Sequence, residues 1–234
     1  MSLMNATEKL FGSIPLDERQ ATVAKQTYAL LSISLVSALV GGYIGSGSQT
    51  LMLFFYQSPF IAFILSMVLL NAVPRIALWA ADRSPTVGLL ALGADGFLSG
   101  LAISPLLFIA RFYHPEMIVA AGAVTAAAFL SVTGYMLITR ERFNAPSGLM
   151  TGMFVSIMAA ILINSLLLHM PLLGIIISIG IAIFGVIMLI YATSEVLTDP
   201  SFDSPVRGAL MLFAALFNIF VSALRLLLSF TSRD

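Results

Sequence analysis

The chain has 234 residues, of which 59% are hydrophobic and only 9% charged, and its mean hydropathy is +1.03. Soluble domains carry about a quarter charged residues, so 11 basic and 11 acidic side chains exclude a soluble globular protein. The lack of cysteine excludes disulfides and thiolate sites, and two histidines leave little for a zinc or iron centre. Zero net charge without a basic cluster gives nucleic acid no electrostatic basis for binding. The composition therefore predicts a membrane protein with lipid as its main surroundings.

Apolar runs long enough to cross a bilayer follow one another along the chain. Residues 1–26 form a polar tail without the apolar run of a cleaved signal peptide. About 20 helical residues cross a hydrocarbon core roughly 30 Å thick, and residues 27–234 hold seven such runs: 28–44, 58–80, 85–109, 115–139, 147–169, 171–196 and 206–230. Short connections predict that consecutive helices are antiparallel neighbours in one all-α polytopic bundle. Ser104-Pro105 predicts a kink in the third span.

Basic residues lie mainly on one side of these spans. One side holds Arg111, Arg225 and Arg233, and the other holds eight: Lys9, Arg19, Lys25, Arg75, Arg83, Arg140, Arg142 and Arg207. Because loops rich in lysine and arginine stay in the cytoplasm, we expect a cytoplasmic N-terminus. Seven crossings then place the C-terminus on the periplasmic or extracellular side.

Asp95 is the most informative polar residue, because it lies about ten residues into the third span. A lone carboxylate there costs about 3 kcal/mol on insertion scales, so it must be solvated, paired or protonated. Two interpretations stay open: a cation or proton site, or a structural partner of an arginine. The candidate partners are Arg75 and Arg225, although either guanidinium can also reach the headgroups instead.

Three acids, Glu195, Asp199 and Asp203, cluster between the sixth and seventh spans, opposed only by Arg207. Several carboxylates together attract calcium, but this spacing fits no dedicated calcium loop and favours a solvated acidic turn. Gly-xxx-Gly spacings favour close packing of helices within the chain, while they also serve contacts between chains and leave the oligomeric state open. They occur at Gly41/Gly45, Gly96/Gly100 and Gly148/Gly152.

The end of the chain carries a recognisable pattern. The segment AALFNIFVSALR at 214–225, followed by SFTSRD at 229–234, resembles the last helix of the Bax inhibitor-one family, most closely its bacterial YccA-like branch. Four further segments agree in order: AISP at 102–105, GYMLITR at 134–140, SGLM at 147–150 and YATS at 191–194. The resemblance implies an inner-membrane protein in which six helices surround a central seventh.

The resemblance also implies a mechanism that this chain does not fully carry. Family members are implicated in calcium leak, and those studied as channels use two aspartates, on helices six and seven, that share a proton and gate the pore. The corresponding positions here are Ala192 and Ala215, whereas the neighbouring Asn218 is retained. The pH-gated mechanism therefore lacks its acids in this chain.

Two functional hypotheses of different class follow. The favoured one, suggested by the YccA-like branch, is a modulator of a membrane-anchored AAA protease of the FtsH type and of membrane protein quality control, since it needs no carboxylate pair. The alternative is a leak pathway for calcium or another cation, lined by Asp95, Asn218 and Glu195. Neither hypothesis needs a resident cofactor or metal. No paired acids or nucleophile beside a base indicate an enzyme.

Overall fold

The computed structural model describes residues 18–144 and 147–231, and all regular elements in these ranges are helical. The helices are α2 (Glu18–Gly47), α3 (Gln49–Gln57), α4 (Pro59–Ala81), α5 (Pro85–Ala102), α6 (Ser104–Tyr113), α7 (Pro115–Thr139), α8 (Ser147–Ile163), the π-helix η1 (Asn164–Leu168), α9 (Pro171–Thr198) and α10 (Pro205–Thr231). Among the described residues six helical segments are long and apolar enough to cross a membrane, and the number rises to seven if the bent pair of α5 and α6 is counted as one span. The prediction of an all-α polytopic membrane protein is confirmed.

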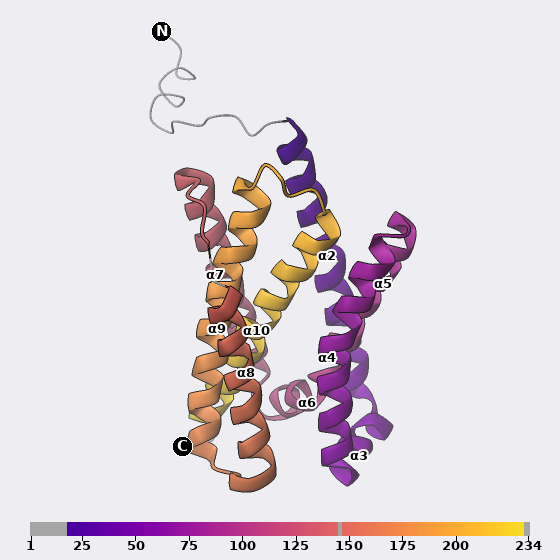
Figure 1. The fold of residues 1–234 in the computed structure, drawn as a ribbon. Helices are drawn as coiled ribbons and strands as arrows, with labels where there is room; N and C mark the ends of the chain where they lie inside the picture. Colours follow the sequence, from indigo (N-terminus) through magenta and orange to yellow (C-terminus); the bar gives the residue numbers. More distant parts are fainter. Residues whose placement is uncertain (1–17, 145–146, 232–234) are drawn as a thin grey trace.

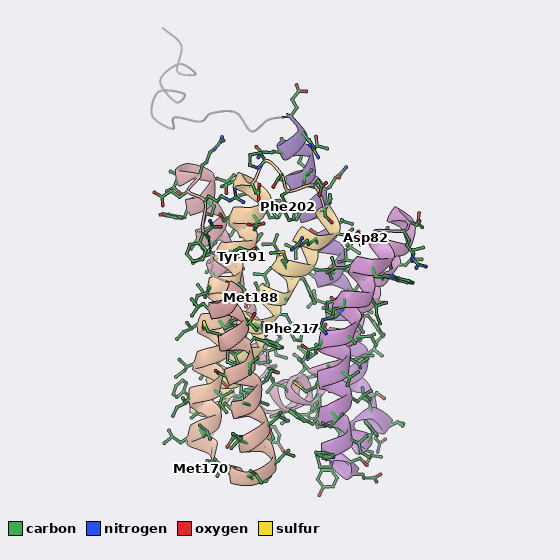
Figure 2. The ribbon with its side chains drawn as sticks, viewed as in Figure 1. Asp82, Met170, Met188, Tyr191, Phe202 and Phe217 are labelled. Carbon is green, nitrogen blue, oxygen red and sulfur yellow. The ribbon has the colours of Figure 1, made fainter. Side chains whose placement is uncertain are left out.

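The outer surface of the bundle is apolar. Side chains along the middle of the helices are almost entirely carbon (Figure 2), and large apolar residues such as Leu90, Val119 and Leu130 are exposed. In water such a surface would drive aggregation. Lipid is therefore the medium in which this exterior is stable.

The third span is broken at the predicted place. Helix α5 ends at Ala102 and α6 begins at Ser104, with a 53° bend between them. Pro105 lies in the first turn of α6, where its missing N–H costs no helical hydrogen bond. The Ser104 hydroxyl donates to the carbonyl of Leu101 at 2.6 Å. The break lets the span continue to Tyr113, so the expected end at residue 109 was too early.

The first helix begins earlier than expected. Helix α2 starts at Glu18, well before residue 28, because Val23, Ala24 and Thr27 are already buried and hold this turn against the bundle. Residues 18–26 therefore form the first turns of α2. The remainder of the proposed tail, residues 1–17, lies outside the described residues.

Helix α10 lies at the centre of the bundle. It packs against α2, α4, α5, α7 and α9, and it runs obliquely between the group formed by α2, α4 and α5 and the group formed by α7, α8 and α9 (Figure 1). Its buried face joins Leu92 of α5 and Leu189 of α9 in the main apolar core. The expected central position of the last helix is confirmed.

Consecutive helices are not all neighbours, so that part of the prediction was wrong. Helix α7 packs on α6, α9 and α10, whereas α8 packs on α9. The cause is the segment that follows α7, which crosses the end of α9. Arg140 there adopts a left-handed conformation with φ 52°, and the Phe143 N–H donates to the Ser194 hydroxyl at 2.7 Å. The connection thus carries the chain past α9 before α8 begins.

Candidate functional site

Asp95 is buried inside the bundle, as the sequence indicated. Only 2% of the surface of Asp95 is exposed. Within residues 18–144 and 147–231, no group forms a hydrogen bond or ion pair with its carboxyl. A buried polar group without a protein partner is usually satisfied by water or an ion. Asp95 is therefore the strongest candidate for a group that acts on a proton or cation.

Helix α5, which carries Asp95, packs closely against α2 through its glycines. A Cβ added to Gly96, the residue after Asp95, would lie 2.3 Å from the backbone oxygen of Ser34. One added to Gly100 would lie 2.1 Å from the backbone oxygen of Ala38. Only glycine permits such backbone contact.

The Gly-xxx-Gly spacings therefore have different roles. Gly41 and Gly45 of α2 also pack against backbone or side chains of the third span, which confirms the expected packing within the chain for the first two pairs. A Cβ added to Gly148 or Gly152 would meet nothing within 4 Å. The third pair thus takes no part in packing among the described residues.

Unpartnered hydroxyl groups lie on the buried face of α2. Thr27 and Ser34 are fully buried, and their hydroxyls have no hydrogen-bond partner among the described residues. The two residues are seven positions apart, so they share one face about 10 Å apart along the helix. Ser34 lies against α5 at Gly96, whereas Thr27 lies against α10 at Gly208. One buried hydroxyl of α2 therefore faces α5 and the other faces α10.

Neither arginine considered as a partner pairs with Asp95. Arg75 is exposed on α4. Arg225 lies against α9 instead, where a Cβ added to Gly174 would be 3.5 Å from its Nη2 atom. With Asn164 and His169 it lines a polar cavity of about 570 Å³.

The π-helix η1 and the turn after it contribute Asn164 and His169 to this polar cavity. The carbonyl of Asn164 accepts from the His169 N–H at 2.8 Å, and its side-chain oxygen accepts from the Met170 N–H at 3.0 Å. His169 is left-handed, with φ 49°. Asn164 thus closes the turn between α8 and α9 and does not join two helices across the bundle. Helical periodicity in the sequence does not indicate this turn-closing role.

The acidic turn differs from its prediction at one residue. Asp199 is buried and accepts a hydrogen bond from Arg142, so it is neither solvated nor opposed only by Arg207. Hydrogen bonds from the side chain and backbone of Ser201 lower the pKa of Asp199, and the charge of Arg142 lowers it further against the effect of burial. Asp203 is exposed and Glu195 half-buried. In the part of the chain that the structure describes, no three acids or histidines gather as they would around a metal ion.

Comparison with known proteins gives the family. Residues 20–232 match the family described as "Inhibitor of apoptosis-promoting Bax1". The chain belongs to the Bax inhibitor-1 family. An uncharacterized protein of Campylobacter jejuni is 32% identical to it over 89% of each chain. An uncharacterized protein of Neisseria meningitidis is 31% identical over 91% of this chain and 93% of the relative. A 27% identical protein of Escherichia coli K12, named "Modulator of FtsH protease YccA", aligns over 91% of each chain.

The positions that correspond to the aspartates of Bax inhibitor-1 channels lie deep in the core. Ala192 of α9 and Ala215 of α10 are both fully buried and belong to one apolar cluster with Leu189 and Leu212. Asn218 is half-buried, and only its backbone oxygen has a polar contact in the described structure, with the Ser222 hydroxyl at 2.7 Å. In this Bax inhibitor-1 protein the α9–α10 contact is therefore apolar where the channels carry acids.

Proposed function

We propose that this protein is a non-enzymatic modulator of a membrane-anchored AAA protease of the FtsH type, acting in membrane protein quality control at the inner membrane. The observation that carries the proposal is the relative from E. coli, whose name states that activity and whose alignment covers 91% of each chain. An alignment over almost the whole length of both chains supports a shared fold, and we carry the named activity over to this chain as a proposal.

The apolar contact between α9 and α10 supports a role without ion conduction. A gate that opens by protonation needs acids whose charge changes with pH. Ala192 and Ala215 carry none, and both are enclosed by leucine and phenylalanine side chains. A partner that binds a protease requires no such gate.

The test is association with the protease in membranes. We expect the tagged full chain to co-purify, after crosslinking in intact membranes, with the FtsH-type protease of the same cell. A variant that lacks residues 1–17 tests the segment before α2 without removing the buried residues Val23 and Ala24. Its matched control replaces the same 17 residues with a polar Gly/Ser segment of equal length.

The outcomes separate the segment from the bundle. Loss of association in both the truncated and the replaced variants assigns binding to the sequence of residues 1–17. Retention in both assigns binding to the helical bundle. Failure of the full chain to associate with the protease contradicts the proposed function.

A second candidate, a cation leak, is favoured by one specific observation. The Asp95 carboxyl is buried without a partner among the described residues, and the buried hydroxyls of Ser34 and Thr27 on the neighbouring α2 also lack partners there. Carboxylate and hydroxyl oxygens are ligands that calcium accepts. Such a path would use different residues from the α9–α10 pair, and neither Asn218 nor Glu195 lies on α2 or α5.

Liposomes loaded with a calcium dye test this candidate. The proposed modulator function predicts no flux above that of empty vesicles at neutral or acidic pH. Flux that Asp95→Asn abolishes would instead establish the leak and place Asp95 in its path. Flux that survives this substitution would leave Asp95 a structural residue and place the path elsewhere.

A further inference from the structure

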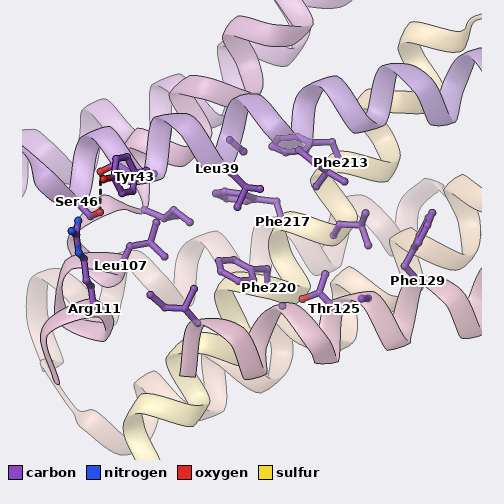
Figure 3. Close-up of a pocket in the computed structure, with 18 residues that line it drawn as sticks. Leu39, Tyr43, Ser46, Leu107, Arg111, Thr125, Phe129, Phe213, Phe217 and Phe220 are labelled. Carbon is purple, nitrogen blue, oxygen red and sulfur yellow. Dashed lines mark hydrogen bonds between the residues drawn. The ribbon is translucent and has the colours of Figure 1, made fainter. Parts of the chain in front are cut away.

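A long apolar groove lies between α2 and α7. It has a volume of about 520 Å³, and α10 forms its floor through Phe213, Phe217 and Phe220 (Figure 3). This volume is within the range of sites that hold small molecules. Helix α10 packs against both α2 and α7, which keeps the groove between them.

The two ends of the groove differ in chemistry. At one end the rings of Tyr28 and Phe129 meet edge to face, with centroids 6.0 Å apart, and close the space between the helices. At the other end lies the guanidinium of Arg111, whose centre is 5.4 Å from the centroid of the Tyr43 ring (Figure 3). The groove is therefore apolar along its length and positively charged at its mouth.

The polar groups along the wall have no free donor to offer a ligand. The Thr125 hydroxyl donates to the Ala121 carbonyl at 2.8 Å, and the Ser46 hydroxyl donates to the Tyr43 carbonyl at 3.2 Å. Arg111 is the exception, because no carboxylate in the described ranges lies within ion-pair distance of it. Glu116, the acid closest to it in sequence, contacts His114.

The length and opening of the groove match one leaflet of a bilayer. Its wall on α2 runs from Leu35 to Ser46, which is about 17 Å along a helix axis. Half of a hydrocarbon core roughly 30 Å thick is about 15 Å. Leu39 and Tyr43 on the rim are 72% and 70% exposed, so the groove opens to the surrounding lipid.

We propose that this groove binds one acyl chain of an anionic phospholipid, whose phosphate contacts Arg111. An acyl chain fits a narrow apolar channel one leaflet deep, and a phosphate supplies the acceptor that the guanidinium lacks. The lipid comes from the leaflet on the side of the membrane where α6 lies. Because none of the described residues that line the groove is an acid that could receive an ammonium group, an anionic headgroup binds better than a zwitterionic one.

Electron paramagnetic resonance of a spin-labelled lipid tests the proposal. The full chain in detergent micelles is titrated with phosphatidylglycerol that carries a nitroxide near the end of one acyl chain, and the immobilised fraction is measured. We expect saturable immobilisation, displaced by unlabelled phosphatidylglycerol more effectively than by phosphatidylcholine. Arg111→Gln should weaken binding about tenfold, because it removes hydrogen bonds to a charged phosphate.

A matched pair of glycine variants tests the groove itself. A Cβ at Gly122 or at Gly134 would meet nothing within 4 Å, and both residues lie on α7, but only Gly122 lines the groove. Gly122→Phe should abolish saturable immobilisation, whereas Gly134→Phe should leave it unchanged. Equal binding by both variants, equal loss in both, or no effect of Arg111→Gln overturns the proposal.

A second measurement uses the unchanged protein, so its result does not depend on whether a variant folds. Phosphatidylglycerol with a photoreactive group on its acyl chain is crosslinked to the reconstituted protein, and the labelled peptides are identified by mass spectrometry. Labelling concentrated on α2, α7 and α10 around the groove supports the proposal. Labelling spread evenly over the outer faces of α4 and α8, or blocked because a second copy of the chain covers the groove, contradicts it.

Discussion

Arg142 donates a hydrogen bond to the carboxylate of Asp199, 57 residues further along the chain. The contact ties the segment after α7 to the end of α9. The N–H of Phe143, next to Arg142, donates to Ser194 one turn before the end of the same helix. Together these bonds fix the path of the chain around α9 and thereby the positions of α7 and α8.

The Asp199 carboxylate makes the stability of this region depend on pH. Because its pKa is lower in the folded protein than in the unfolded chain, its contribution is complete above the unfolded value, near 3.9, and disappears as pH falls through the folded value. Asp199→Asn should lower stability by about 1 kcal/mol at neutral pH, as expected for a hydrogen bond to a partly exposed arginine. Thermal unfolding in detergent, followed by circular dichroism at several pH values, measures this difference. A difference between the two proteins that does not shrink towards pH 3 would contradict the assignment.

Backbone contact between α2 and α5 predicts a strong effect of one methyl group. Gly100→Ala places a Cβ 2.1 Å from the Ala38 carbonyl oxygen and should cost about 1–3 kcal/mol, because the two helices must move apart. Gly134→Ala, which meets nothing within 4 Å, should be neutral or stabilising by up to about 1 kcal/mol. The midpoints of thermal unfolding in the same detergent compare them. Equal midpoints would show that α2 and α5 do not touch as described.

Removal of the charge at Asp95 should not weaken the fold. A buried carboxyl without a protein partner opposes folding, so Asp95→Asn should raise stability by about 1 kcal/mol or leave it unchanged. Chemical unfolding in mixed micelles provides the measurement. A marked loss of stability would mean that Asp95 has a partner that stabilises the bundle, and the leak hypothesis would lose its main support.

The orientation across the membrane is open to a direct test, since the chain has no cysteine of its own. Single cysteines are introduced at two exposed acids: Asp203 after α9 and Glu116 at the start of α7. We expect a membrane-impermeant maleimide to label Glu116→Cys from outside intact spheroplasts, and Asp203→Cys only after lysis. The reverse pattern would contradict a cytoplasmic N-terminus.

Local sequence patterns predicted the membrane helices well, because apolar runs and proline positions act within one helix. The break at Ser104-Pro105 follows this logic. The central position of α10 was instead expected from the family resemblance. The start of α2 was misjudged because the charged residues near Glu18 concealed a helix whose apolar side is buried. Charge alone does not show which face of a terminal turn packs against the bundle.

Contacts between distant segments could not be predicted. Asp199 was assigned to a solvated acidic turn and Arg142 only to the basic side of the membrane, and nothing in their local spacing shows that the loop after α7 contacts the end of α9. The same limit applies to glycines, since Gly96 and Gly148 stand in identical spacings but only Gly96 meets another backbone. Burial of Asp95 was predicted from its depth in the span. Its lack of a partner among the described residues could not be predicted, because it depends on which side chains the neighbouring helices place around it.

Reconstitution with the protease tests the central claim most directly. An FtsH-type protease and a membrane-protein substrate are placed in liposomes with or without this chain, and the half-life of the substrate is measured in the presence of ATP. The account predicts that the intact chain changes this half-life, while the same lipid content without the chain does not. An unchanged half-life, with the chain inserted and folded in the same vesicles, would contradict it.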